Sequence, residues 1–255
     1  MKKLLFLFIG ILIASCCNQP ELLKNGLTKK AREITEYTIK VKKDSRNEII
    51  NDTLSKTTKR YNGKDQIIYR IQLSLIDNEE MEIDYIYDDY KKIKREIVKM
   101  SADSLPYIVN YIYKDSILHQ SKGIVENENE KFEQIETYFY KKNETKEKTI
   151  SSQIFIDLES SDTIRNIAST SYFDKNEFIE RIETINHKDN KRNHKIEYKY
   201  DCETLVKTME YNHKDSLIST TKYEYQFDRF QNWIEQKSIE NNKLNYIRIR
   251  EIEYK

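Results

Sequence analysis

The sequence has few of the residues that usually bend or cross-link a chain. It holds 4 glycines, 2 prolines and 3 cysteines in 255 residues. Glycine-rich phosphate loops and nucleophile elbows need more glycine than this, and none of their motifs occurs. Only Cys202 lies in the body of the chain, which excludes an internal disulfide framework. Cys17 is interpreted as a bystander thiol, and a bridge from Cys17 to Cys202 is the alternative.

The sequence also lacks an excess of one charge, because 44 basic side chains accompany 43 acidic ones. This balance excludes the basic footprint of a nucleic-acid-binding protein. The 4 histidines form no HExxH pair and no Cys/His spacing typical of zinc. We therefore predict a protein that is not an enzyme and takes no metal and no cofactor. Carboxylates are numerous, so sequence alone leaves an acid/base pair open.

The one long apolar run lies between Leu4 and Ala14 and follows two lysines. It is shorter than the roughly 20 apolar residues that cross a bilayer, so it predicts a secretory signal. The residues Ile13-Ala14-Ser15-Cys16 resemble a bacterial lipobox, which implies a signal peptide over 1–15 and lipidation of Cys16. An ordinary cleaved signal is the alternative. We expect an exported protein held by acyl chains, in the outer membrane rather than the inner one, with the periplasmic or surface side left open.

What the body of the chain does have is alternation. Apolar or aromatic residues alternate with charged ones over 194–200 and 221–227, which is the period of a strand with one covered and one wet face. Aromatic strand ends recur about every 27 residues, enough for two strands and two turns. They are Tyr61, Tyr87, Tyr113, Tyr140, Phe173, Tyr200, Tyr225 and Tyr254. Asn, Asp, Lys and Ser make the turns, because Asn and Asp tolerate positive φ.

These patterns predict an all-β fold. We expect an antiparallel meander of about eight degenerate hairpin repeats that forms one long twisted sheet, curled into an open barrel or a solenoid. This domain spans 34–255 and follows a tether or short helix over 16–33. Curling is expected because a flat sheet with one apolar face would leave that face and its edges exposed. Truncation is expected to fail by whole hairpins.

The last repeat carries a family resemblance. The stretch from Tyr223 to Trp233, YEYQFDRFQNW, followed by Lys243 and Leu244, resembles the YD-repeat (Rhs-like) units of small lipoproteins from Bacteroidetes-type bacteria. The positions that match are Tyr225, Asp228, Asn232, Trp233, Lys243 and Leu244. Glycine is usual in the family where Gln231 and Asn242 stand. The resemblance covers about 35–255, strongly only after His194, and implies an antiparallel β-repeat scaffold without catalytic residues.

We interpret six residues of this unit as structural. They are Tyr223, Tyr225, Asp228, Phe230, Asn232 and Trp233. The tyrosines and Phe230 would fill the inner face of the sheet, the Asp and Asn would brace the turn, and the tryptophan would pack over the next strand. The alternative is a stacking platform for a sugar or peptide, which requires several exposed rings on one face.

A second short pattern combines Asp, then Ser or Thr, then an aliphatic residue. Five copies resemble the acceptor sequence of the general O-glycosylation system of Bacteroidetes. The candidate acceptors are Thr53, Ser104, Ser116, Thr163 and Ser216. A turn that ends in Asp-Ser and enters a strand gives the same tripeptide, so a purely structural explanation stays open.

Two functional classes remain. The first is a membrane-anchored, non-catalytic scaffold of the cell envelope that binds a glycan or an envelope protein or has a structural role. The alternative is a half-barrel that carries a lipid or another apolar ligand. A scaffold should pack its concave aromatic residues against one another, whereas a carrier should show an open apolar cavity of several hundred Å³.

Overall fold

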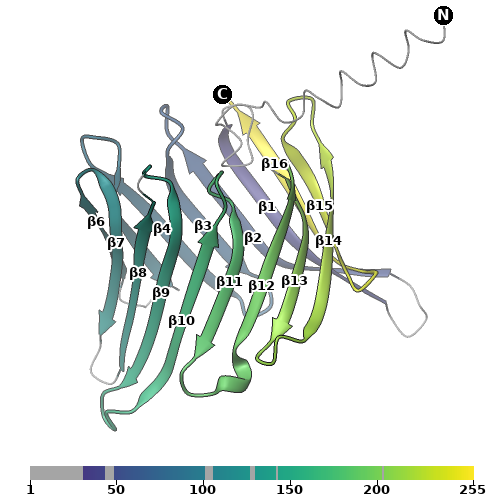
Figure 1. The fold of residues 1–255 in the computed structure, drawn as a ribbon. Coiled ribbons are helices and arrows are strands. Elements are labelled where there is room, and N and C mark those ends of the chain that lie inside the picture. Colours follow the sequence, from purple (N-terminus) through teal and green to yellow (C-terminus); the bar gives the residue numbers. More distant parts are fainter. Residues whose placement is uncertain (1–30, 44–48, 101–105, 127–129, 142, 203) are drawn as a thin grey trace, which may run out of the picture.

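The structure is a computed structural model that describes residues 31–43, 49–100, 106–126, 130–141, 143–202 and 204–255. These residues form sixteen strands and one short 3₁₀ helix (Figure 1). The predicted signal peptide, Cys16, Ser104 and the tether up to residue 30 lie outside them. None of the helical segments within these ranges has the length and hydropathy needed to span a bilayer.

The strands follow one another without any other fold element except the 3₁₀ helix Asn190–Arg192. The first eight are β1 (Ala31–Lys43), β2 (Ile49–Tyr61), β3 (Ile67–Ser74), β4 (Glu79–Tyr87), β5 (Ile93–Met100), β6 (Tyr107–Lys114), β7 (Ile117–Glu126) and β8 (Glu130–Tyr140). The second eight are β9 (Lys146–Asp157), β10 (Thr163–Phe173), β11 (Ile179–Asn186), β12 (His194–Asp201), β13 (Thr204–Asn212), β14 (Leu217–Phe227), β15 (Trp233–Glu240) and β16 (Lys243–Tyr254). The prediction of an all-β antiparallel meander is confirmed.

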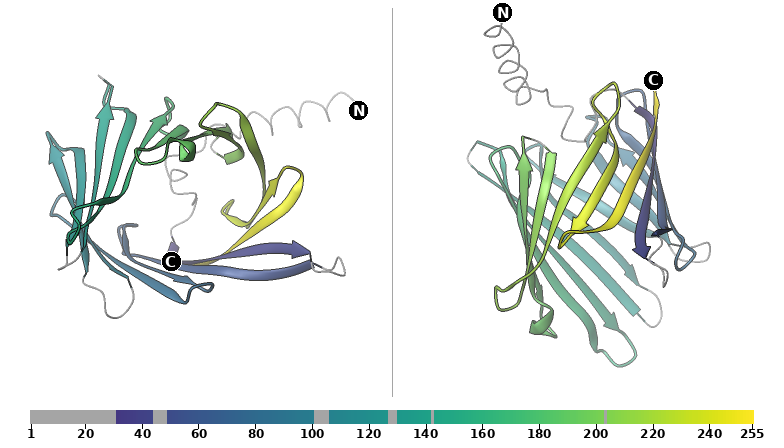
Figure 2. Two further views of the ribbon diagram at one scale, coloured as in Figure 1. Left: turned by 90° about the horizontal axis from the view of Figure 1, so that it is seen from below. Right: turned by 90° about the vertical axis from the view of Figure 1, so that its right-hand side faces the viewer.

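The sheet is closed. Each strand pairs with the next, and β1 also pairs with β16 from Ala31 opposite Tyr254 to Lys40 opposite Tyr246. The purple β1 and the yellow β16 lie side by side in Figure 1 and Figure 2. The prediction of an open barrel or solenoid was therefore wrong. An even number of meandering strands brings the first and last together in antiparallel orientation, and their pairing removes both exposed edges.

The aromatic residues of the repeat mark one rim of the barrel. They lie at the ends of the even-numbered strands: five are the last residue, Tyr113 and Tyr200 lie one residue before the end, and Tyr225 lies two residues before the end of β14. A bulge immediately precedes the last aromatic residue of each even-numbered strand from β2 to β14. Because bulges bend a strand and increase its twist, a bulge in every repeat favours closure. We call this end the aromatic rim; β1 begins and β16 ends there.

Turns at the aromatic rim adopt a left-handed conformation without glycine. In the β14–β15 turn, Asp228 accepts bonds from the backbone N–H of Phe230 at 2.8 Å and of Asn232 at 2.9 Å. Gln231 in that turn has a φ of 62°. Four turns place a residue of similar φ at the same position: Asp65, Lys91, Glu144 and Glu177. Gln231 thus adopts the left-handed conformation that glycine usually supplies.

The pairing register assigns every second side chain to the inside of the barrel. Tyr107 on β6 and Phe132 on β8 lie with ring centroids 5.6 Å apart, although β7 runs between them. They meet over Gly123, where a Cβ atom would lie 2.1 Å from the Tyr107 hydroxyl oxygen. Side chains from strands two apart meet on the concave side, so this face is the inner one.

Most of the 19 tyrosines lie on the inner face. They are Tyr61, Tyr85, Tyr87, Tyr107, Tyr111, Tyr113, Tyr138, Tyr140, Tyr198, Tyr200, Tyr223, Tyr225, Tyr246 and Tyr254. They are half-buried. The buried apolar residues of the described ranges are few: Ala31, Ile34, Ile83 and Val98. Tyrosine therefore lines the interior without filling it.

Candidate functional site

The interior of the barrel is the candidate site. A barrel of about sixteen strands is wide enough to keep an aqueous interior, and the half-buried inner side chains agree with this. Between β10, β11 and β12, a cavity of about 690 Å³ is lined by apolar, polar and charged side chains. They are Ile164, Ile167, Thr184, Asn186, Lys188, Asp189, Arg192 and His194. We call the hollow interior the lumen.

Tyrosines at the aromatic rim tie the two strands of a hairpin together. The hydroxyl of Tyr87 donates to the Ile67 carbonyl oxygen at 2.8 Å. The Tyr113 hydroxyl donates to the Ile93 carbonyl oxygen at 2.9 Å, and the Tyr225 hydroxyl donates to the Leu205 carbonyl oxygen at 2.8 Å. Each acceptor lies near the start of the preceding strand. These hydroxyls are occupied by the fold, so the rim tyrosines present ring faces rather than donors to the lumen.

One step further into the lumen, tyrosines bond carboxylates. Tyr111 donates to Glu96 Oε1 at 2.7 Å, and Tyr138 donates to Glu136 Oε2 at 2.6 Å. Burial raises the pKa of Glu96 and of both tyrosines. Glu136 acts electrostatically on Glu96 across β6 and β7. We call this part of the lumen the acidic wall; it supplies carboxylate acceptors next to aromatic rings.

The opposite charge gathers on β16, β2 and β3. We call the inward side chains Lys59, Arg70, Arg248 and Arg250 the basic wall. Arg250 Nε lies 3.0 Å from Glu36 Oε2 on β1. Its guanidinium carbon lies 3.4 Å from the centroid of the Trp233 ring. Burial is the main cause that lowers the pKa of Lys59 and of Arg250.

The lumen is therefore bipolar. Arg70 of the basic wall lowers the pKa of Glu96 on the acidic wall, against the larger effect of burial. Tyr85 lies on the inner face of β4 between these strands, where Glu96 and Arg70 both act on it electrostatically. Donors, acceptors and ring faces occur together along one surface. Within the described ranges, no three His, Cys, Asp or Glu side chains gather as a metal site.

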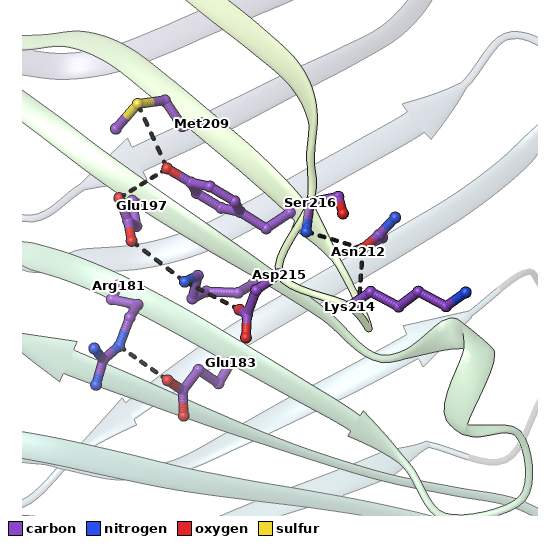
Figure 3. A network of polar contacts seen from close by, with 10 residues as sticks. Arg181, Glu183, Glu197, Met209, Asn212, Lys214, Asp215 and Ser216 are labelled. Carbon is purple, nitrogen blue, oxygen red and sulfur yellow. Dashed lines mark hydrogen bonds and ion pairs between the residues drawn. The ribbon is translucent and has the colours of Figure 1, made fainter.

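The outer face of the barrel is also charged. On β11 to β13, Arg181 lies 3.1 Å from Glu183, and Lys195 lies 3.5 Å from Glu197 and 3.3 Å from Asp215 (Figure 3). Further pairs lie on the outer face of β7 and β8, Lys122 with Glu133 at 3.0 Å, and of β15, Lys237 with Glu235 at 3.3 Å. Exposed pairs add little stability. They show instead that both faces of the wall carry charge.

Three of the six residues interpreted as structural, Asp228, Phe230 and Asn232, form a cluster with Tyr254 at the aromatic rim. Tyr254 donates to Asp228 and accepts from Asn232 Nδ2 at 2.7 Å. Asn232 is fully buried, and the Phe230 ring lies edge-on to Tyr254 at 4.8 Å. The last strand is thereby held to the turn between β14 and β15.

The other three members of that set lie on β14 and β15. Tyr225 accepts a bond from Gln236 Nε2 at 2.6 Å and lies edge-on to Trp233 at 6.2 Å. Tyr223 lies one step further into the lumen, with its hydroxyl 3.3 Å from Thr208 Oγ1. The set is thus divided between a turn cluster and the lumen surface.

The predicted O-glycan acceptors are scattered. Thr53 is exposed on the outer face of β2, Ser116 and Ser216 are exposed in turns, and Thr163 is half-buried at the start of β10. Ser116 has a φ of 70°. Cys202 is exposed in the turn after β12. The structure brings none of these described residues into one site, and O-glycosylation stays a prediction.

Sequence reasoning missed the basic wall. Overall charge is balanced, so a local excess of cations leaves no trace in composition. A signal was present in β16, where Ile247, Arg248, Ile249 and Arg250 alternate. We expected the apolar residues of such a strand to point inward. The arginines point inward instead, because they share the face of Glu36 and Gln236.

Comparison with known proteins identifies the architecture. No family model and no curated protein matches the sequence. A porin-like protein from Bacteroides vulgatus ATCC 8482 superposes with a TM-score of 0.52 at 11% identity, over 89% of this chain and 99% of that one. A porin-like protein from Bacteroides uniformis ATCC 8492 gives 0.52 at 12% identity, over 88% and 98%. The chain shares with both the fold of a closed antiparallel β-barrel.

Proposed function

We propose that this protein is a lipid-anchored, non-catalytic barrel of the cell envelope that binds a polar, glycan-like ligand in its lumen. The observation that carries the proposal is the inner face, where half-buried tyrosines stand among carboxylates, amides and guanidinium groups. Saccharide rings offer an apolar face for stacking and a rim of hydroxyls for hydrogen bonds. An aromatic surface with donors and acceptors beside it is complementary to both.

The barrel wall carries polar and charged side chains on its inner face and charged side chains on its outer face, and this favours a barrel that is surrounded by water and not by lipid. A membrane-spanning barrel presents an apolar band to lipid, and each Lys or Arg at the midplane costs about 2–4 kcal/mol. Here Lys122, Lys195, Lys222 and Lys237 occupy outward positions inside strands. Acyl chains on Cys16 would then be the contact with the membrane. From Cys16 to Ala31 the chain could reach at most about 50 Å, which would keep the aromatic rim near the bilayer.

A carrier of an apolar ligand is less well supported. Such a ligand requires an apolar cavity, whereas the cavity of about 690 Å³ next to β10–β12 includes Lys188, Asp189 and Arg192 in its lining. The polar character of this lining favours a ligand with many hydroxyl groups.

The experiment compares two tyrosines on an oligosaccharide array. Tyr198 lies on the inner face, and Tyr211 lies on the outer face, where its hydroxyl donates to Glu197. We expect the purified lipoprotein in detergent to retain at least one oligosaccharide. Tyr198→Leu should weaken that binding about 5- to 150-fold, because stacking of a nucleic-acid base on one aromatic ring contributes on the order of 1–3 kcal/mol and we expect a similar magnitude for a sugar ring. Tyr211→Leu should leave it unchanged. Retention of no saccharide, or equal effects of both variants, would contradict the proposal.

A further inference from the structure

The basic wall contains an uncompensated concentration of positive charge. Lys59 on β2 lies directly opposite Arg70 on β3 in the register. Like charges in directly opposed positions destabilise a sheet. Arg248 lies one inward position from Arg250 on β16 and is exposed to the lumen. Four cations thus share a small area of the inner face. Because their repulsion destabilises the fold, we expect that they are retained for a functional role.

Few carboxylates balance these cations. Glu36 already forms an ion pair with Arg250. Among the residues that the structure describes, Lys59, Arg70 and Arg248 have no carboxylate within ion-pair distance. Glu96 reaches Arg70 only electrostatically, and its own hydrogen bond goes to Tyr111. The wall therefore keeps a net positive charge.

The guanidinium groups also keep unused donors. Arg70 Nη2 donates to Gln72 at 2.6 Å, but Arg70 Nε is buried and has no acceptor among the described residues. Arg250 Nη1 is likewise buried and has no acceptor among the described residues. Buried polar groups in folded proteins nearly always find a partner.

We propose that the basic wall binds an oxyanion, a carboxylate or a phosphate, carried by the lumen ligand. The inference rests on the proposed function and narrows it to an acidic glycan. Guanidinium groups match both oxyanions because their fork of N–H donors can bond two oxygens at once. The tyrosine surface beside the wall would hold the sugar ring while Arg248 and Lys59 neutralise the acid group.

The test is calorimetric titration of the intact lipoprotein in detergent. The probes are an oligogalacturonate, a phosphorylated oligosaccharide, a neutral oligosaccharide of equal length, and inorganic phosphate. We expect one or both acidic saccharides to bind about tenfold more tightly than the neutral one, as a charge-assisted bond would give. Arg248→Gln should abolish that advantage, Arg248→Lys should keep part of it, and Lys222→Gln on the outer face should change nothing.

The outcomes separate this inference from the proposed function. Equal binding of acidic and neutral saccharides would overturn the anion site and leave a lumen that binds glycans. Binding of inorganic phosphate alone, lost in Arg248→Gln, would support the anion site and contradict the glycan. Equal effects of Arg248→Gln and Lys222→Gln would overturn the site. If Arg248→Gln does not fold, Lys59→Gln replaces it, because removing a repelled cation should keep or raise the melting temperature.

Discussion

At the scale of single residues, the chain uses left-handed turns without glycine. Thirteen of the described residues other than glycine have positive φ, and they include Lys91, Glu144, Glu177 and Gln231, which are neither Asn nor Asp. Sequence analysis recognised the polar turns but expected Asn and Asp to supply this conformation. The turn backbone is held by its own bonds, such as Gln231 N–H to the Asp228 carbonyl at 3.0 Å. Local hydrogen bonds therefore impose the left-handed conformation even on residue types that disfavour it.

Gln231→Gly should stabilise the barrel. A side chain in the left-handed region costs about 1–2 kcal/mol, which the substitution removes. Glycine has more conformational freedom in the unfolded chain, and this cancels part of the gain. We expect a net gain of about 0.5–1 kcal/mol in the free energy of unfolding, or about 1–4 °C in melting temperature. Arg229→Gly is the control, because Arg229 lies in the same turn without positive φ. A gain in the control equal to that in Gln231→Gly would contradict the account.

The buried tyrosines should make the fold sensitive to alkali. Burial raises the pKa of Tyr87, Tyr107, Tyr200 and Tyr254 to about 12, whereas an unfolded chain ionises at about 10. Since the folded state retains these protons, its stability is fully present below pH 10 and is lost as pH rises toward 12. Tyrosinate absorbance and circular dichroism should then change together. Ionisation at about pH 10 with an intact fold would contradict this.

At the scale of strands and hairpins, period-2 alternation and aromatic spacing predicted the repeat correctly. The aromatic residue of each unit lies within two residues of the end of an even-numbered strand, because a hairpin is the repeating element. Alternation did not predict which side chains point inward in β16, because both faces of the wall are wet and no dry core selects one. Closure could not be predicted either, since it depends on the long-range pairing of β1 with β16.

Gly123 is required by the contact that crosses β7. A Cβ at this position would lie 2.1 Å from the Tyr107 hydroxyl oxygen and 2.3 Å from Cζ. Gly123→Ala should therefore displace the Tyr107 ring from Phe132 and cost about 1–3 kcal/mol. Gly63→Ala is the matched control, because a Cβ there meets nothing within 4 Å. Adding Tyr107→Leu to Gly123→Ala should recover part of the loss, and purely additive losses would contradict the proposed clash.

Removal of the last hairpin tests closure. A chain that stops at residue 232 lacks β15 and β16, so both β14 and β1 become exposed edges. The repeat pattern in the sequence predicts that truncation fails by whole hairpins. A closed barrel predicts a global loss, seen as aggregation and rapid proteolysis of the whole domain. A soluble product that keeps the dichroism of fourteen strands would support an open array instead.

At the scale of the whole molecule, a charged wall encloses a tyrosine-lined interior. Composition and alternation sufficed to predict an all-β chain, and the lipobox-like residues predicted its export. The bipolar lumen could not be predicted, because Lys59, Arg70 and Arg250 are far apart in sequence and meet only after the sheet closes. The likeness to porin-like barrels describes the fold, while the charges on the outer face set this wall apart from a lipid-facing one.

We propose above all that this barrel folds in water and would reach the membrane only through its lipid. The most direct measurement is sedimentation velocity, with circular dichroism, on residues 18–255 exported behind a cleavable signal without a lipobox and purified without detergent. The account predicts a monodisperse β-rich monomer that needs no detergent. A chain that aggregates in buffer and folds only in micelles or bilayers would contradict it.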